Sequence, residues 1–269
     1  MNLTKELIAE PGLWRLILRV SNQRLSAILL GPESVERSVL SHVEVLADDS
    51  VRTLENAIYD NPLLLSDFAA TDVIISNSDA FVSPTSAAEI REQMAEAMLP
   101  DYCELRRIET EKITDTMEVI YAVNQECYNF LARTFAAAKF HHSLAIDAKY
   151  LYHRNARGGA SAHLYALCEN SDKPALIGFD AAGNLCTLSR PGASTAEDCA
   201  YYILASGGNN DNGPISVGGE PALRNDVCAL LRRMRPDATI LPLTLPEDLL
   251  HLRRQAPDAD FDMIFLTQL

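Results

Sequence analysis

The sequence predicts an α/β protein made of two similar halves, each built on a mixed β-sheet that begins with a three-stranded meander and is flanked by helices. Three observations lead to this fold class. The same order of elements, three strands, a helix, a strand and a helix, occurs twice, about 150 residues apart. The predicted strands are apolar on both faces, as in sheets that helices cover on each side. Short turn-forming segments separate them, which indicates hairpins. We therefore expect an internal duplication.

The first copy opens with two apolar runs joined by the short polar link Ser21–Arg24, which predicts a hairpin. Asp49 and Ser50 precede the first helix, where their side-chain oxygens can cap its N-terminus. The predicted elements are three strands, a helix, a strand and a helix, at residues 13–20, 25–30, 38–46, 51–59, 72–76 and 86–99.

The second copy repeats this order. Its strands are interrupted at residues 169–174 and 181–184, where Gly183 can supply the positive φ of a tight turn. Thr195 stands three residues before Asp198, which favours the start of a helix. The predicted elements lie at residues 163–168, 175–179, 184–190, 195–204, 214–217 and 223–234.

The segment between the copies predicts a further β-α-β-α unit. Its elements lie at residues 117–123, 124–138, 142–146 and 147–154, and we expect them to close the sheet of the first half. Gly158 and Gly159, with small neighbours, end the last helix and form a hinge. The two predicted domains lie at residues 1–157 and 158–269.

Composition narrows the class of protein. The chain has 269 residues, of which 48% are hydrophobic and 22% charged, as in globular domains. It has no apolar run of the ~18 residues that span a membrane and no signal-peptide core before Pro11, so we expect a cytoplasmic protein. The net charge of −14 disfavours nucleic-acid binding. The basic clusters Arg232–Arg235 and Arg253–Arg254 are interpreted as helix C-termini.

Neither the cysteines nor the histidines predict a metal site. The cysteines stand singly, with no C-x-x-C pair, so we expect buried, chemically silent thiols at positions 103, 127, 168, 186, 199 and 228. His141 and His142 are adjacent on a predicted strand and would point to opposite faces, and no carboxylate is spaced to complete a site.

The order of elements carries a resemblance. A duplicated meander followed by β-α units resembles the ribonuclease H-like fold of the actin and Hsp70 superfamily, and it is similar to the cytoplasmic actin-like protein of type IV pilus assembly. Thr195–Tyr202, with Ile215–Gly219 downstream, more closely resembles a Bacteroidetes domain-of-unknown-function family whose fold is that of actin-like ATPases. The likeness covers nearly the whole chain. It implies the fold and brings no activity with it.

The resemblance also indicates where phosphate-binding residues would stand. In the superfamily the first phosphate loop joins the first two strands and carries Asp-x-Gly, whose acid organises the metal and whose glycine lets backbone N–H groups approach phosphate. That hairpin is Ser21–Arg24 here, with neither acid nor glycine. The second loop corresponds to Glu169–Lys173, which has carboxylates but no glycine.

One nucleotide-binding motif remains. The adenosine motif, a strand running into two glycines, corresponds to Ile215–Ala222, so Gly218, Gly219 and Glu220 are the candidate cofactor-binding residues. A helix follows, and its N-terminal N–H groups could meet a ligand. The simpler interpretation, which we favour, is a tight strand-to-helix turn with Pro221 opening the helix.

Two other chemistries find little support. A two-metal nuclease needs a carboxylate on the first strand, and neither 13–20 nor 163–168 contains one. The acidic run Asp258–Asp262 is interpreted as the solvated start of a terminal strand at 263–266. No G-x-S-x-G elbow is present, and 206–213 is a turn-rich loop. We therefore predict no catalytic residues.

The sequence thus favours an actin-like protein without phosphoryl-transfer machinery, a pseudo-ATPase that acts as a cytoplasmic binding or scaffold protein with a protein partner. We expect no cofactor. The alternative is a nucleotide-binding protein or weak ATPase, which would hold ATP and Mg²⁺ in the interdomain cleft and use Glu169 or Asp172.

Overall fold

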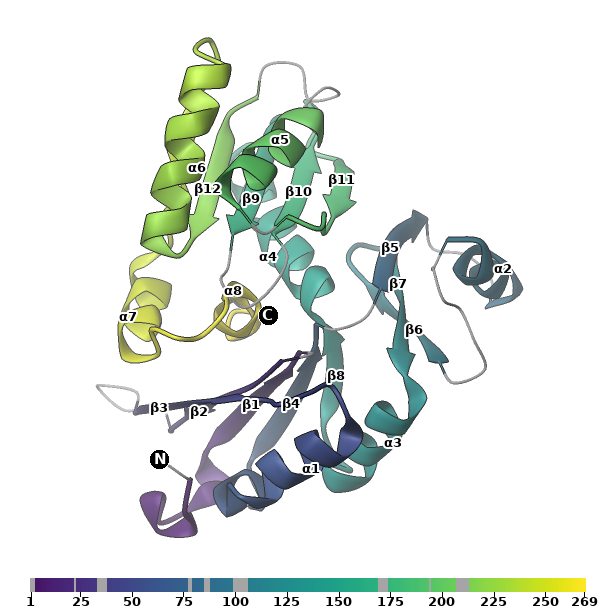
Figure 1. Cartoon of the computed structure of the whole chain (residues 1–269), viewed down its shortest axis with the longest axis vertical. Helices are drawn as coiled ribbons and strands as arrows, with labels where there is room; N and C mark the ends of the chain where they lie inside the picture. The colour runs from purple at the N-terminus through teal and green to yellow at the C-terminus, as the bar shows by residue number, and fades with distance from the viewer. Residues whose placement is uncertain are drawn as a thin grey trace. The chain divides into compact units, whose positions relative to one another are not determined.

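The fold of the chain is shown by a computed structural model, which describes residues 3–21, 23–32, 38–76, 79–84, 88–98, 106–168, 174–193, 195–206 and 213–269 (Figure 1). The chain divides into two compact units. The first comprises Met1–Ala145 and Asp248–Ala259, and the second comprises Ile146–Glu247 and Asp260–Leu269. Each unit contains one five-stranded mixed sheet. The boundary between residues 157 and 158 stays a prediction.

The sheet of the first unit begins with the predicted meander. Its strands lie in the order β3-β2-β1-β4-β8, with β1 antiparallel to β2 and parallel to β4. The strand bounds are β1 Arg15–Val20, β2 Arg24–Leu30, β3 Val39–Val45, β4 Ala70–Ile75 and β8 Lys139–His142. The first strand starts two residues later than predicted, because residues 11–13 form a short 3-10 turn.

Two helices cover one face of this sheet, α1 Val51–Tyr59 and α3 Gln125–Thr134. Both have the predicted amphipathic spacing, so their apolar stripes pack on the side chains of β1 that point to this face. The Ser50 hydroxyl caps α1 by accepting the Thr53 N–H, as the sequence predicts. The core contains Leu16, Leu18, Val20, Leu54, Ile58, Phe130 and Leu131.

The second unit repeats the first. Its sheet has the equivalent order β11-β10-β9-β12-β13, again with an antiparallel meander and parallel pairing beyond it. The predicted duplication is therefore confirmed in the topology. The bounds are β9 His163–Cys168, β10 Ala175–Phe179, β11 Leu185–Ser189, α5 Ala196–Ser206, β12 Ile215–Gly219, α6 Pro221–Met234 and β13 Ile240–Pro242.

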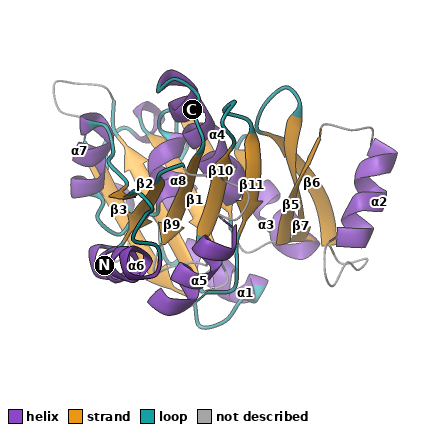
Figure 2. Ribbon diagram, turned by 90° about the horizontal axis from the view of Figure 1, so that it is seen from above, coloured by secondary structure: helices purple, strands orange, loops and turns teal. Residues whose placement is uncertain are grey.

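A separate small sheet interrupts the first copy. Its strands are β5 Asp79–Pro84, β6 Arg106–Lys112 and β7 Met117–Asn124, in the antiparallel order β5-β7-β6. Figure 2 shows these strands beside one another with helix α2, Ala88–Met98, next to them. The strand predicted at 117–123 therefore exists, but it does not close the main sheet as we expected, because it pairs with β5 and β6 on its two sides.

This insertion also changes which helices correspond. In the second unit β12 runs directly into α6 and then β13, and in the first unit β4 and β8 are linked through α3. The counterpart of α6 is thus α3, and not the helix predicted at 86–99. Among the described residues of the second unit no sheet corresponds to β5-β7-β6.

After β13 the chain forms helix α7, Glu247–Gln255, which ends in the predicted basic cluster, and helix α8, Phe261–Leu266. Helix α8 lies where the sequence indicated a terminal strand. All six residues of α8 are buried, and the ring of Phe265 stacks on that of Tyr150 with centroids 3.9 Å apart. Asp260 and Asp262 are 3% and 2% exposed, so the acidic run is not a solvated strand start.

One further helix bears on the site. Helix α4, Ser143–Arg157, begins directly after β8, so residues 143–146 are helical where a strand was predicted.

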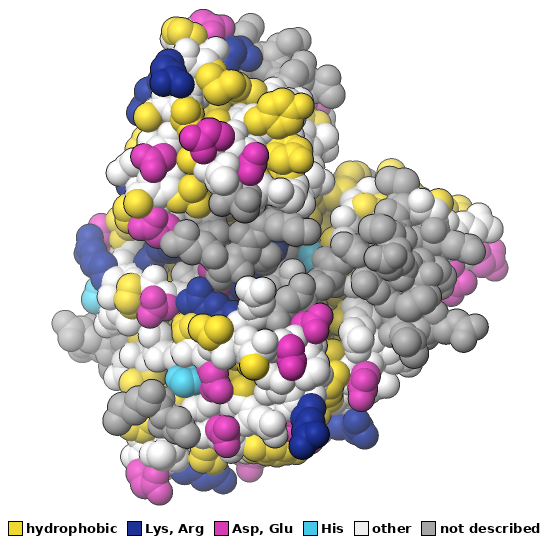
Figure 3. All heavy atoms as spheres, viewed as in Figure 1, with side chains coloured by type: hydrophobic (Ala, Val, Ile, Leu, Met, Phe, Trp, Pro, Cys, Tyr) yellow, Lys and Arg dark blue, Asp and Glu magenta, His cyan; other side chains and the backbone are white. Residues whose placement is uncertain are grey.

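Within the described part of the chain, no helix is long and apolar enough to cross a membrane. On the face of the protein that Figure 3 shows, the described acidic and basic side chains are interspersed.

Candidate functional site

The predicted cofactor-binding residues lie at the junction between β12 and α6. Gly218 and Gly219 are the last residues of β12, paired in parallel register with Leu167 and Cys168 of β9. Gly219 has φ +133°, a conformation that residues with side chains rarely adopt. A Cβ atom there would lie 1.9 Å from the carbonyl oxygen of Cys168. The close approach of the β9 backbone therefore requires a glycine at position 219.

Gly218 is fixed by contacts on the opposite face of the sheet. A Cβ atom on it would lie 2.7 Å from Leu243 Cδ2 and 3.0 Å from Phe261 Cε2. Phe261 belongs to α8, the helix that the sequence did not predict. The space beside this glycine is thus occupied by side chains of the same unit.

Glu220 turns back onto its own helix. Its Oε2 accepts the Leu223 N–H at 3.0 Å, which makes Glu220 the N-cap of α6, and Pro221 opens the helix as predicted. The backbone N–H groups of Leu223 and Ala222 hold the pKa of this carboxyl below its usual value. The first turn of α6 therefore already carries an anion, at the place where a phosphate would otherwise benefit from the helix dipole.

Of the other two predicted loops, Ser21–Arg24 is described except for Asn22, and Glu169–Lys173 lies outside the described residues. In the β1–β2 hairpin, Ser21 donates from its N–H and its hydroxyl to the Arg24 carbonyl oxygen, at 3.0 and 3.1 Å. The Gln23 carbonyl oxygen accepts the Leu46 N–H at 2.8 Å, so this turn is tied to the end of β3. Asn22, Glu169 and Asp172 lie outside the described residues, as do 207–212.

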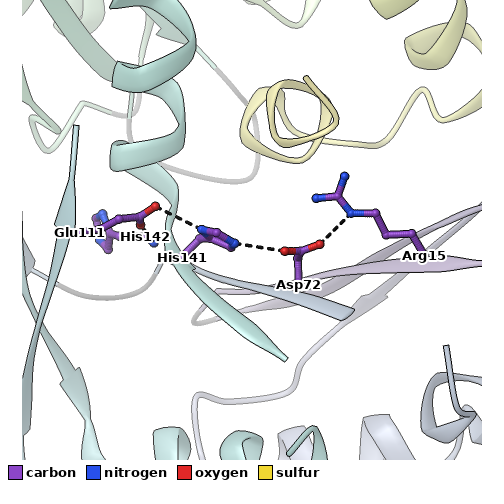
Figure 4. A network of polar contacts seen from close by, with 5 residues as sticks. All are labelled: Arg15, Asp72, Glu111, His141 and His142. Carbon is purple, nitrogen blue, oxygen red and sulfur yellow. Dashed lines mark hydrogen bonds and ion pairs between the residues drawn. The ribbon is translucent and has the colours of Figure 1, made fainter. Parts of the chain in front are cut away.

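The structure brings together a polar network that the sequence did not predict (Figure 4). His141 of β8 lies between two carboxylates, with Nε2 at 3.1 Å from Asp72 Oδ1 and Nδ1 at 3.1 Å from Glu111 Oε1. Asp72 comes from β4, and its second oxygen accepts from Arg15 Nε of β1 at 2.7 Å. Glu111 comes from β6, and its second oxygen accepts the His142 N–H at 2.7 Å.

The geometry fixes the charge of the ring. Both ring nitrogens face carboxylate oxygens, and a neutral imidazole has only one N–H to offer. Burial alone would lower the pKa of His141, but the hydrogen bonds to Asp72 and Glu111 outweigh it and raise this pKa to about 9. Burial alone would raise the pKa of the Asp72 carboxyl, but the contacts with His141 and Arg15 outweigh it and hold this pKa below the usual value. His141 is thus a cation at neutral pH.

This network links two sheets of the first unit. Arg15, Asp72 and His141 belong to the main sheet, whereas Glu111 belongs to the inserted one. Tyr121 of β7 adds a ring contact to His142, with centroids 4.7 Å apart. The sequence did not reveal these carboxylate partners, because they lie 69 and 30 residues away from His141 in the chain.

The network is built for charge pairing. Figure 4 shows Asp72 and Glu111 on opposite sides of the imidazole, so their oxygens do not converge on one point. Among the described residues, no three His, Cys, Asp or Glu side chains are arranged to hold a metal ion. What the arrangement can do chemically is hold β6 against β8 through an ion triad.

The cysteines and the basic clusters complete the comparison with the sequence. Cys127, Cys168, Cys199 and Cys228 are buried, as expected, but Cys186 on the edge strand β11 is exposed, and Cys103 lies outside the described residues. Burial raises the pKa of the Cys127 thiol to about 11. The arginines at 232 and 233 and at 253 and 254 lie in the last turns of α6 and α7, as predicted.

Solved structures with this architecture confirm the fold. A protein of unknown function with an actin-like ATPase fold from Bacteroides thetaiotaomicron superposes with a TM-score of 0.77 at 17% sequence identity, covering 97% of each chain. The PilM–PilN type IV pilus biogenesis complex gives a TM-score of 0.56 at 10% identity, covering 94% of this chain and 97% of the other. These identities establish the actin-like fold alone.

Sequence comparison places the chain in a family. No curated protein matches it. The family model described as "Protein of unknown function (DUF3822)" matches residues 7–216, well over half of the chain. The chain has the predicted mixed sheets and the actin-like fold, and it belongs to the DUF3822 family.

Proposed function

We propose that this protein is a non-catalytic, cytoplasmic binding protein with an actin-like fold, which has lost phosphate handling and serves as a scaffold for a protein partner. One observation carries the proposal. At the end of β12, where actin-like ATPases would hold adenosine, the two glycines are explained by contacts inside the second unit.

Ligand binding at this strand end would require displacement of several groups. Leu243 and Phe261 lie against Gly218, and the Cys168 carbonyl lies against Gly219. The glycines are therefore needed by the packing of the protein itself. Phe261 is 5% exposed, and removing its ring from this position would expose apolar surface.

Electrostatics at the same junction also disfavours a nucleotide. The Glu220 carboxylate accepts a backbone N–H of the first turn of α6, so an approaching phosphate would meet a negative charge and a donor already in use. On the first unit, the hairpin at Ser21–Arg24 lacks the acid and the glycine of a phosphate loop. Its Arg24 guanidinium donates instead to the Asp258 carbonyl oxygen, at 3.0 Å.

A binding role agrees with one structural neighbour. The neighbour with a TM-score of 0.56 is PilM in complex with PilN, so a protein of this architecture assembles with another protein. We infer the same class of partner, a protein, for this chain. The absence of predicted catalytic residues in the sequence leaves binding as the simplest role for the fold.

Titration with nucleotide tests the first half of the proposal. We expect isothermal titration with Mg-ATP and Mg-ADP to give no heat of binding, and thermal melts to show the same midpoint with and without nucleotide. A saturable stabilisation by Mg-ATP would overturn the proposal. If turnover accompanied it, the double variant Glu169→Gln, Asp172→Asn would show whether the second loop supplies the acid.

A partner test addresses the second half. The tagged chain is cross-linked in the cells that produce it, and the adducts are purified and identified by mass spectrometry. We expect one protein to be recovered reproducibly and in constant ratio to the chain, and purified samples of the two to associate with and without Mg-ATP. Association that requires ATP would contradict a nucleotide-independent scaffold.

A further inference from the structure

Helix α5 presents two tyrosine rings on its exposed side. Tyr201 and Tyr202 are 63% and 36% exposed, and their ring centroids lie 5.4 Å apart with an interplanar angle of 74°. The opposite side of the helix is buried in the core of the second unit through Cys199, Ala200 and Ile203. Figure 3 shows hydrophobic side chains gathered over α5. Tyrosines that a helix holds in solvent are typical anchors of protein interfaces, because each ring offers a large contact area with few rotatable bonds.

Two carboxylates stand one turn before these rings. Asp198 precedes Tyr201 by three residues and Tyr202 by four, so the three side chains share one face of the helix, and Glu197 lies four residues before Tyr201. Side chains on a helix lean towards its N-terminus, so both rings lean towards the carboxylates. Both acids are exposed, and within the described part of the chain neither side chain has an ion pair or a hydrogen bond. We call this surface, Glu197, Asp198, Tyr201 and Tyr202, the α5 face.

The chemistry of the α5 face selects a cation. The face of a tyrosine ring attracts the charged group of Lys or Arg, and a carboxylate beside the ring pairs with the same group. Arginine fits best, because its planar guanidinium stacks on a ring while its N–H groups reach a carboxylate. The chain uses this arrangement in its own first unit, where the Arg107 guanidinium carbon lies 4.3 Å from the centroid of the Tyr128 ring and Arg107 Nε pairs with Glu109.

The net charge of the chain favours a basic partner over a second copy. At −14, two copies repel each other, whereas a basic segment is attracted by the whole chain and by the two unpaired carboxylates. Given the binding function proposed above, on which this step rests, we propose that the protein partner docks on the α5 face. A basic segment of the partner places an arginine against the tyrosine rings, and its guanidinium pairs with Asp198 or Glu197.

An NMR titration of the full chain tests the chemistry of this face without the partner. The probe is the peptide acetyl-Gly-Arg-Gly-Arg-Gly-amide, and the matched control peptide carries citrulline, which keeps the shape of arginine and lacks its charge. We expect the arginine peptide to shift the ring signals of Tyr201 and Tyr202 and the amide signal of Asp198 saturably, with at least ~3-fold weaker binding of the citrulline peptide. Unchanged ring signals would overturn the proposal.

Variants on the surface separate this face from general charge attraction. Tyr201→Leu and Asp198→Asn should each weaken the arginine peptide at least ~3-fold. Asp226→Asn is the control, because it removes the same charge from an exposed position on α6 and should leave the affinity unchanged. The proposal is overturned if Asp226→Asn weakens binding as much as Asp198→Asn does. It is also overturned if the parent chain alone sediments as a dimer that Tyr201→Leu abolishes, because the occupant would then be a second copy.

The partner recovered by cross-linking separates this proposal from the binding function itself. Its affinity should fall at least ~10-fold for the double variant Asp198→Asn, Tyr201→Leu, since both the ion pair and the ring contact are lost. If the partner binds this variant as tightly as the parent chain, the docking surface is wrong and the binding function stands. Recovery of no partner would count against the binding function alone, because the peptide titration decides on the α5 face independently.

Discussion

His141 Nδ1 on β8 and Glu111 Oε1 on β6 lie 3.1 Å apart, and this contact joins two different sheets. Asp72 faces the opposite nitrogen of the same ring at the same distance. One imidazolium thus compensates two partly buried carboxylates. Removing the imidazolium would take away the charged N–H group that faces each of these carboxylates.

The first prediction concerns this ring. His141→Gln can donate to only one of the two carboxylates, so we expect the free energy of unfolding to fall by roughly 2–3 kcal/mol, below the value for a fully buried pair because the ring is 18% exposed. Urea unfolding measures the change. His42→Gln is a matched control, because its ring is similarly shielded, with 11% exposed, but faces a single carboxylate, that of Glu44 at 3.6 Å, and it should change the same quantity by less than His141→Gln does. Equal effects would contradict a special role for His141.

The second prediction concerns pH. The pKa of His141 is raised from 6.5 to about 9 in the folded protein. The pairing of protonated His141 with Asp72 and Glu111 therefore contributes fully to the free energy of unfolding below pH 6.5, and this contribution is lost as the pH rises through 9. We expect unfolding free energies between pH 6 and pH 10 to fall more steeply in the parent protein than in His141→Gln. A His141 ring signal in NMR that titrates near its ordinary pKa would refute this.

The sequence predicted most elements of the fold, because alternation, turn residues and helix caps depend on neighbouring residues alone. Strands β9 and β10 and helix α1 have the bounds that alternation, turn residues and caps indicate. The same reasoning failed for α8, since a short apolar run such as 263–266 has no periodicity that separates a helix from a strand. It also placed residues 117–123 in the wrong sheet, because strand pairing is a long-range property.

The same distinction between local and long-range signals applies to the candidate site. The turn at Gly218, Gly219 and Glu220 could be predicted from the sequence, because two glycines at the end of an apolar run, with Pro221 opening a helix, are typical of a strand-to-helix turn. The network around His141 is not, because Asp72, Glu111 and Arg15 come from three other strands. Only the inserted sheet brings Glu111 to β8, and nothing near residue 111 signals that position.

A third prediction tests the strand end. Gly219→Ala should lower the free energy of unfolding by more than ~2 kcal/mol, because φ +133° is strained for alanine and the new Cβ would overlap the Cys168 carbonyl oxygen at 1.9 Å. Gly192→Ala is the control. A Cβ there meets nothing within 4 Å, and we expect a change within ~0.5 kcal/mol. Thermal and urea unfolding of both variants decide the comparison. If Gly219→Ala were as stable as the parent protein, the backbone at this position would not be fixed.

The last prediction uses a double-mutant cycle to ask whether side chains of the protein fill the space beside Gly218. Gly218→Ala places a methyl group 2.7 Å from Leu243 Cδ2, so we expect it to destabilise the fold by ~1–3 kcal/mol through overpacking. Leu243→Ala removes a buried side chain and is also destabilising. The double variant should lose less than the sum, because the new methyl occupies part of the space that Leu243 leaves, and the coupling should exceed ~0.5 kcal/mol. Strict additivity in urea unfolding would mean that Leu243 does not fill this site, and would remove a main support for the loss of nucleotide binding.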